Sequence, residues 1–168
     1  EAVVPSKYCK GFHYAPCGQL QFPTQLIRAG KTSRGDLVEF PLEQDEEIFG
    51  FGLQHYQFNH KGTKLTLRVN ADARGATGDS HAPVPFFVTS KKRGFYVDTA
   101  RAAEFYCGYP RLQQAAGEGD SGDTTEELYA VRKACDTTWM SILIPAAEGV
   151  DLYVFEGENL SEVVSGYN

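Results

Sequence analysis

Residues 86–99 contain the feature that most constrains the fold: two short runs of β-branched and aromatic residues joined by a polar connection. The runs are residues 86–90 and 95–99, and Lys-Lys-Arg-Gly lies between them. This arrangement predicts a β-hairpin, because such runs suit strands and a glycine-containing polar connection suits a turn. The preceding loop places Asp79, Ser80 and His81 beside two prolines, so polar groups gather where the hydrophobic ribbon begins.

The rest of the chain repeats this pattern of short strand-like segments between glycine, proline and other turn residues. We expect further strands at residues 19–22, 37–40, 46–54, 65–69, 103–108, 127–134, 138–145 and 150–157. About ten short strands, with no visible linker or repeat, predict a single all-β domain over residues 1–168, an antiparallel β-sandwich. Asn159 with Glu162 three residues later matches a capping box, so a short C-terminal helix should close the chain.

Local patterns predict details of this sandwich. Leu65, Leu67 and Val69 alternate with polar residues, so this face of their strand should lie in the core. Gly50 and Gly52 flank a single aromatic residue, which indicates a β-bulge or the close approach of another backbone. The polar stretches 30–36, 73–83 and 113–125 should be loops.

Composition excludes two classes of partner. The formal net charge is −6 and the pI is near 5.2, which argues against a nucleic-acid surface or an anionic membrane as the main partner. The one basic cluster, residues 91–93, falls in the predicted turn and is interpreted as a solvated loop. No apolar run reaches the length of a membrane-spanning helix. The chain begins without Met and lacks the basic and apolar regions of a signal peptide, so its compartment stays unassigned.

The four cysteines do not define a metal site. Cys9, His13 and Cys17 have a spacing that resembles zinc ligands, but Gly11 and Pro16 break any helix that would align them, and a fourth ligand is not evident. A local disulfide or buried free thiols are favoured, and Cys107 and Cys135 leave both possibilities open. The chain has no phosphate-binding glycine loop and no Gly-x-Ser-x-Gly motif, so we expect neither a metal nor another cofactor.

One polar constellation has the composition of a binding site. Its members are Asn70, Asp72, Arg74, Asp79 and His81. Loop carboxylates accept hydrogen bonds from sugar hydroxyls, and neighbouring aromatic residues could supply a stacking surface. The alternative is structural: Asn and Asp turn the chain through side-chain hydrogen bonds to the backbone, and the residues alone favour this interpretation. Likewise, Asn159-Leu160-Ser161 is a glycosylation sequon, although a helix cap is the favoured role of its asparagine.

A series of motifs runs in order from about residue 46 to the end of the chain. They are Glu47-x-Phe49-Gly50-Phe51-Gly52-Leu53-Gln54, Asn59-x-Lys61-Gly62, Leu67-x-x-Asn70-x-Asp72, Pro85-Phe86-Phe87-Val88-Thr89-Ser90, Gly94-Phe95-Tyr96-Val97-Asp98 and Tyr153-x-Phe155-x-Gly157 with Val163, Val164 and Tyr167. Together they resemble the N-terminal domain of glycoside hydrolase family 31, which contains α-glucosidases, α-xylosidases and related transglycosylases. The first forty-odd residues carry little of the resemblance.

The resemblance implies a galactose mutarotase-like β-sandwich that precedes a catalytic (β/α)8 barrel, its partner in the full-length protein. The family's catalytic aspartates lie on the barrel and neither motif occurs here, so the chain holds no catalytic residue and ends where catalysis would begin. Asp72 occupies the position of a family aspartate that reaches over the barrel and contacts an α-linked oligosaccharide substrate. For Asp72, the resemblance therefore favours a substrate contact over a purely structural role in a turn. Asp79 and His81 are weaker candidates for a second contact, and Gln54 departs from the Glu of many members.

Two other functions are alternatives to a supporting domain of an α-glycosidase. One is a free-standing carbohydrate-binding module. The other is an aldose mutarotase, because His55-Tyr56-Gln57-Phe58-Asn59 superficially resembles a mutarotase His-x-x-Phe-Asn segment.

Overall fold

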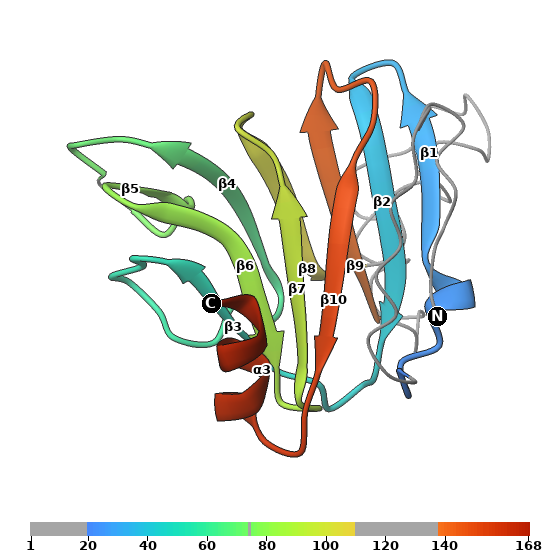
Figure 1. Ribbon diagram of the computed structural model, residues 1–168. Coiled ribbons are helices and arrows are strands. Elements are labelled where there is room, and N and C mark those ends of the chain that lie inside the picture. The colour runs from blue at the N-terminus through green and yellow to red at the C-terminus, as the bar shows by residue number, and fades with distance from the viewer. Residues whose placement is uncertain (1–19, 74, 110–137) are drawn as a thin grey trace, which may run out of the picture.

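The computed structural model describes residues 20–73, 75–109 and 138–168, which form two β-sheets and one α-helix (Figure 1). A 3₁₀ helix, η1 (Thr24–Leu26), precedes the first strand, and the helix α3 (Leu160–Tyr167) follows the last. The strands are β1 (Arg28–Thr32), β2 (Gly35–Leu42), β3 (Ile48–Gly52), β4 (Thr63–Val69), β5 (Asp79–Ser80), β6 (Pro83–Thr89), β7 (Arg93–Asp98), β8 (Ala103–Tyr109), β9 (Thr138–Pro145) and β10 (Asp151–Glu156). The predicted all-β sandwich with a short C-terminal helix is confirmed.

The two sheets have different sizes. The larger has the strand order β1-β2-β9-β8-β4-β5, and the smaller has the order β10-β7-β6-β3. Each neighbouring pair is antiparallel except β4 and β5, which run parallel over two residues. In the described residues, the sandwich is thus antiparallel apart from this one short pair. The pair forms because the chain leaves β4, makes a loop, and returns along the same edge in the same direction.

The core between the sheets is built from phenylalanines. The Phe40 and Phe95 rings stack at 4.5 Å between centroids, and Phe51 and Phe87 stack at 5.1 Å. Phe105 meets Phe51 edge-on at 5.0 Å. All five side chains are fully buried. Offset and edge-to-face contacts of this kind add specific geometry to ordinary hydrophobic burial, so these rings fix how the two sheets face each other.

The predicted hairpin is confirmed as β6 and β7, paired in the register Phe87↔Phe95. Its turn does not consist of solvated charges alone, which corrects the interpretation of residues 91–93. Lys91 Nζ lies 2.9 Å from Asp45, and Arg93 Nη2 lies 3.1 Å from Glu43. Both acidic partners lie between β2 and β3, so the turn ties the hairpin to that connection.

A β-bulge in β3 orients the side chains of that strand. Pairing with β6 shifts register between Gly50 and Gly52, as the two glycines predict. Phe51, between them, has φ 66° and is fully buried, although the outward-facing Phe49 lies only two residues before it. In a regular strand these two residues would face the same side, so the bulge is what turns Phe51 into the core. A side chain at Gly52 would come within 2.3 Å of the Ala82 carbonyl oxygen, which explains the second glycine.

Other expected elements differ from the structure. Residues 20–22 form no strand, whereas residues 30–36, expected to be a loop, include the end of β1 and the start of β2. The segment 46–54 is a strand only at its centre, as β3. Leu65 and Leu67 are buried as predicted, but Val69 is 74% exposed, because β4 extends past the end of the core there.

The helix α3 covers the outer face of the smaller sheet (Figure 1). The Asn159 Oδ1 atom accepts a hydrogen bond from the Glu162 amide at 3.0 Å, which confirms the predicted cap. Val163 is fully buried, and the Tyr167 ring stacks on Phe86 at 4.2 Å between centroids. Gly94 in β7 makes room for this contact, because a Cβ atom there would lie 2.6 Å from Val163 Cγ1.

Several predictions fall outside the described residues. They are the strand at 127–134, the first residue of the strand expected at 19–22, the loop at 113–125, and the environments of Cys9, His13, Cys17 and Cys135. Cys107 is a buried free thiol, and burial raises its pKa. In the described part of the chain, no helix is both long and apolar enough to cross a membrane.

Candidate functional site

Four residues of the predicted binding site, Asn70, Asp72, Asp79 and His81, lie on the connection from β4 to β6, at one end of the sandwich, and Arg74 falls outside the described residues. The loop is closed at its base by the parallel pairing Arg68↔Asp79 and Val69↔Ser80. A further backbone hydrogen bond joins the Asn70 amide to the Ser80 carbonyl oxygen at 2.9 Å. The loop is therefore a backbone-anchored excursion from the larger sheet, and residues 71–73 lie beyond the paired edge.

Asn70 links the two candidate aspartates. Its Oδ1 accepts a hydrogen bond from the Asp72 amide at 3.0 Å, and its Nδ2 donates to Asp79 Oδ2 at 3.1 Å. The side-chain turn that the residues alone favoured is thus present, but Asn70 makes it. Asp72 itself is exposed, so the turn fixes its backbone while its carboxylate lies at the surface.

Asp79 is held as an anion at the base of the loop. Arg68 Nη2 lies 2.7 Å from Asp79 Oδ2, and only 10% of the Asp79 side chain is exposed. Hydrogen bonds from Arg68 and then Asn70 lower the pKa of Asp79. Its contacts therefore give Asp79 a role in positioning the loop that carries Asp72.

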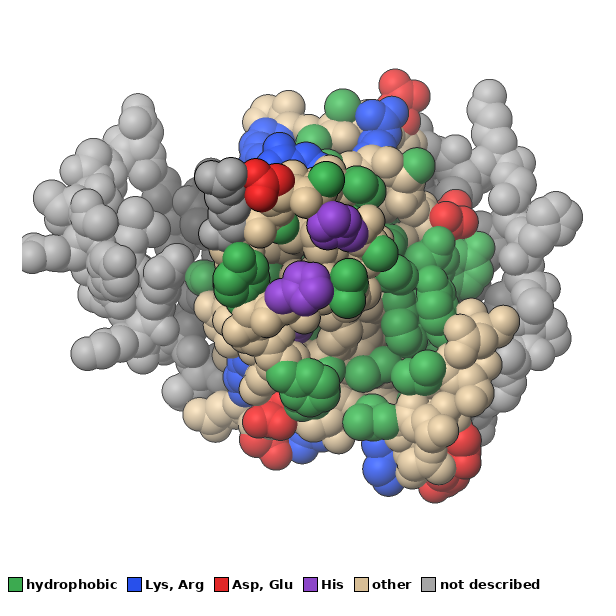
Figure 2. Space-filling view, turned by 90° about the vertical axis from the view of Figure 1, so that its left-hand side faces the viewer, with side chains coloured by type: hydrophobic (Ala, Val, Ile, Leu, Met, Phe, Trp, Pro, Cys, Tyr) green, Lys and Arg blue, Asp and Glu red, His purple; other side chains and the backbone are tan. Residues whose placement is uncertain are grey.

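His81 lies at the far end of the loop, where the chain meets the segment that follows β3. The Leu53 amide donates to the Ala82 carbonyl oxygen at 3.0 Å, so the segments before His55 and after His81 are adjacent. Both histidines are exposed, and two histidine side chains lie close together on this side of the molecule (Figure 2). The structure thus brings Asp72 and Asp79 together through Asn70, while His81 lies beside the segment that follows β3.

Two side chains from the β3–β4 connection support the loop. The Tyr56 hydroxyl lies 3.5 Å from the Ala73 carbonyl oxygen, and the Tyr56 side chain is largely exposed. Gln54 Nε2 donates to the carbonyl oxygens of Phe51 and Gly78, at 3.1 and 3.3 Å. A glutamate has no hydrogen to donate when ionised, so the amide at this position matches its two acceptors.

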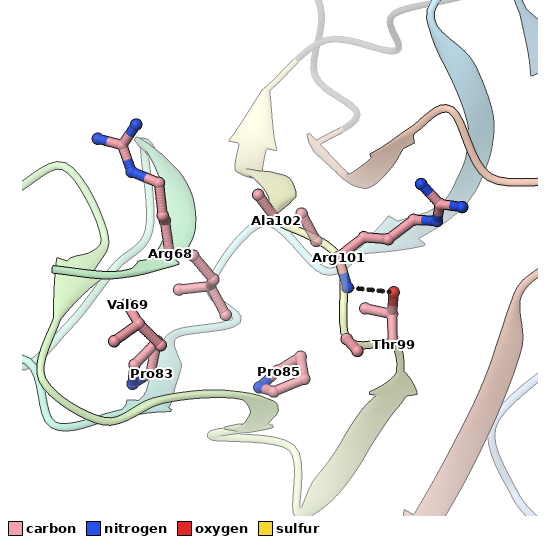
Figure 3. Close-up of a pocket in the computed structure, with 10 residues that line it drawn as sticks. Arg68, Val69, Pro83, Pro85, Thr99, Arg101 and Ala102 are labelled. Carbon is pink, nitrogen blue, oxygen red and sulfur yellow. Dashed lines mark hydrogen bonds between the residues drawn. The ribbon is translucent and has the colours of Figure 1, made fainter.

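A groove of about 240 Å³ lies beside the base of the same loop, and residues before and after the loop line it. Val69 before the loop and Pro83 after it form one wall, and the β7–β8 turn with Thr99, Arg101 and Ala102 forms the other (Figure 3). The guanidinium groups of Arg68 and Arg101 extend away from one another (Figure 3). Sequence reasoning missed this groove, because its walls come from three strands and no motif joins them.

The residues around the loop also bear on two other kinds of site, a metal centre and a mutarotase-like site. Among the residues that the structure describes, no group of three or more His, Cys, Asp and Glu side chains is placed to hold a metal ion. In the mutarotase-like segment, Asn59 Oδ1 accepts hydrogen bonds from the amides of Ile48 and Lys61, at 3.3 and 3.0 Å. The Asn59 side chain thus stabilises the backbone of a turn, while His55 is exposed.

Comparison with known proteins found likeness at the level of structure. No protein-family model matches the sequence, and no curated protein matches it. A family 31 dextranase from Flavobacterium johnsoniae, solved with glucose, superposes with a TM-score of 0.56 at 20% identity. The cycloalternan-forming enzyme of Listeria monocytogenes, solved with a pentasaccharide substrate, gives 0.53 at 23% identity. The cycloalternan-degrading enzyme of Trueperella pyogenes, solved with cycloalternan, gives 0.50 at 19% identity.

The matches cover most of this chain and a small part of each enzyme. They span 83%, 79% and 78% of this chain, in the same order, but only 14%, 11% and 16% of the enzymes. At these identities the likeness establishes the fold. The chain has the β-sandwich fold of one part of much longer carbohydrate-active enzymes, one of which is a family 31 enzyme, in agreement with the resemblance carried by its motifs.

Proposed function

We propose that this chain is the N-terminal β-sandwich domain of a family 31 α-glycosidase. In this proposal it supports the catalytic (β/α)8 barrel and supplies one rim of the pocket for an α-linked oligosaccharide. The observation that carries the proposal is the combination of the family motifs with a fold found in part of a family 31 dextranase, of which the chain covers 14%. The parent protein performs the hydrolysis or transfer, and the two carboxylates of a retaining mechanism come from its barrel.

Asp72 is the residue through which the domain contacts sugar. Its carboxylate is exposed on a loop whose base is fixed by Asn70 and Asp79. A sugar can therefore reach the carboxylate while the turn keeps its geometry. Carboxylate oxygens accept hydrogen bonds from sugar hydroxyls, and a pre-positioned acceptor loses little entropy on binding. His81 is a second polar contact from the end of the loop, and the exposed ring of Tyr56 offers an adjacent stacking face.

The test is replacement of Asp72 in the intact enzyme. Asp72→Ala should lower kcat/KM for an α-linked glucose oligosaccharide by about 5- to 150-fold, because a lost polar contact to a substrate hydroxyl costs about 1–3 kcal/mol. Asp151→Ala is the matched control, since Asp151 is an exposed aspartate on β10, in the other sheet. Equal kinetics for both variants would leave Asp72 a turn residue and remove the domain from the substrate pocket.

A further inference from the structure

One side of the smaller sheet carries an exposed apolar surface without charged residues. Phe58 is 80% exposed and its ring packs against Phe49, with 4.9 Å between centroids. Leu53, on the same connection, is 46% exposed, and Val164 on α3 is 40% exposed. We call the surface made by Phe49, Leu53 and Phe58 the β3 face.

The β3 face is depleted of charge as well as rich in apolar groups. Residues 48–59 contain no Asp, Glu, Lys or Arg, and neither do residues 80–90 or 163–168, in a chain whose charged fraction is 23%. In the space-filling view, charged side chains lie along the margins of this side and hydrophobic ones gather between them (Figure 2). Charge depletion around exposed aromatic residues is typical of the centre of a protein interface, and isolated surface hydrophobics do not produce it.

The chain reaches the end of α3 beside the β3 face. Tyr167 stacks on Phe86 of β6, and β6 is the strand that pairs with β3. The C-terminus therefore lies next to β3 and β6 (Figure 1). Any polypeptide that follows Asn168 starts at the edge of the β3 face, so little chain is needed to cover it.

We propose that the β3 face is the surface on which the polypeptide following Asn168 packs. This inference rests on the proposed function, in which the chain continues into a barrel. It adds which face of the sandwich is buried by that barrel and which residues form the centre of the contact. The matched enzymes are long enough for such a continuation, because the chain accounts for only 11% to 16% of their length.

Hydrogen exchange of the isolated chain and of the intact protein tests the inference. Amides of residues 54–59 lie in a connection without regular structure, so they should exchange rapidly in the isolated chain. In the intact protein their exchange should slow by roughly tenfold or more, because burial against a second domain suppresses local opening. Unchanged exchange in a protein that does contain a barrel would overturn this inference alone. An intact protein that ends near Asn168 would overturn the proposed function with it.

Replacement of Phe58 provides a second measurement. Phe58→Asp should leave the melting temperature of the isolated chain within about 1 °C but lower that of the intact protein by at least about 3 °C, because the charge would be buried at the interface. Leu26→Asp is the control, since Leu26 is 42% exposed on η1, away from the β3 face. Equal shifts in both proteins would contradict the inference. So would an isolated chain that forms a dimer dissociated by Phe58→Asp, because the β3 face would then bind a second copy.

Discussion

At the scale of single residues, Glu104 on β8 shows how polar groups stabilise the larger sheet. Only 11% of its side chain is exposed, and Arg34, Lys64 and the Tyr106 hydroxyl all bond to it. Burial alone would raise the pKa of Glu104, but the hydrogen bonds from Tyr106, Lys64 and Arg34 outweigh it and lower the pKa to about 2. The ionised form is therefore part of the folded structure.

The lowered pKa predicts how stability depends on pH. A carboxyl group with a lower pKa in the folded state stabilises the protein above its unfolded pKa, near 4.5, and this contribution is lost as pH falls toward 2. Glu104→Gln should lower the free energy of unfolding at pH 7 by about 1–3 kcal/mol and flatten its dependence between pH 4.5 and 2.5, measured by urea denaturation. Asp45→Asn, at a carboxylate 77% exposed, should have little effect. Identical profiles for wild type and Glu104→Gln would refute this role.

Residue patterns alone could predict that Asp72 lies on a loop but not the contacts within that loop. The Asn-x-Asp motif identified Asp72 as a loop carboxylate. The bond from Asn70 to Asp79, nine residues away, depends on the parallel pairing of β4 and β5, and no local periodicity encodes that pairing. The groove beside the loop was missed for the same reason, since its walls belong to strands distant in sequence.

At the scale of elements, the contact between α3 and the β6–β7 hairpin depends on a glycine in a strand. Gly94→Ala would place a methyl group 2.6 Å from Val163 Cγ1 and 3.3 Å from Phe86 Cε2, in a region where Val163 is fully buried. We expect a loss of about 1–3 kcal/mol in the free energy of unfolding, because an overpacked contact must shift the helix.

Urea denaturation of two glycine variants measures this. Gly149→Ala is the control, since no atom lies within 4 Å of the added methyl group there. Adding Val163→Ala to Gly94→Ala should recover part of the overpacking cost, because the two side chains compete for one space. Equal unfolding midpoints for Gly94→Ala and Gly149→Ala would show that α3 does not dock at this position.

Elements with a clear apolar period were predicted well, and those held by backbone pairing alone were not. The strand at residues 138–145 has the predicted bounds, because its apolar residues pack into the core. β1 was missed: four of its five residues are exposed, and it pairs only with β2 at the edge of the sheet. An exposed edge strand leaves no hydrophobic pattern in the sequence, so only the paired structure reveals it.

At the scale of the whole molecule, we propose different roles for two surfaces, the loop at the edge of the larger sheet and the β3 face of the smaller sheet. The loop that carries Asp72 forms a rim for sugar, whereas the β3 face meets the domain that follows α3. Both roles require a longer protein, and both leave the sandwich itself without catalytic groups.

The most direct test of the central claim is the activity of the intact protein compared with that of residues 1–168 alone. Both are incubated with an α-linked glucose oligosaccharide, and the anomeric protons of the products are followed by NMR. We expect the intact protein to release or transfer α-configured glucosyl units, as a retaining mechanism requires, and residues 1–168 neither to cleave the substrate nor to speed the interconversion of free glucose anomers. An intact protein without α-glycosidase activity, or residues 1–168 that interconvert the anomers by themselves, would contradict the central claim.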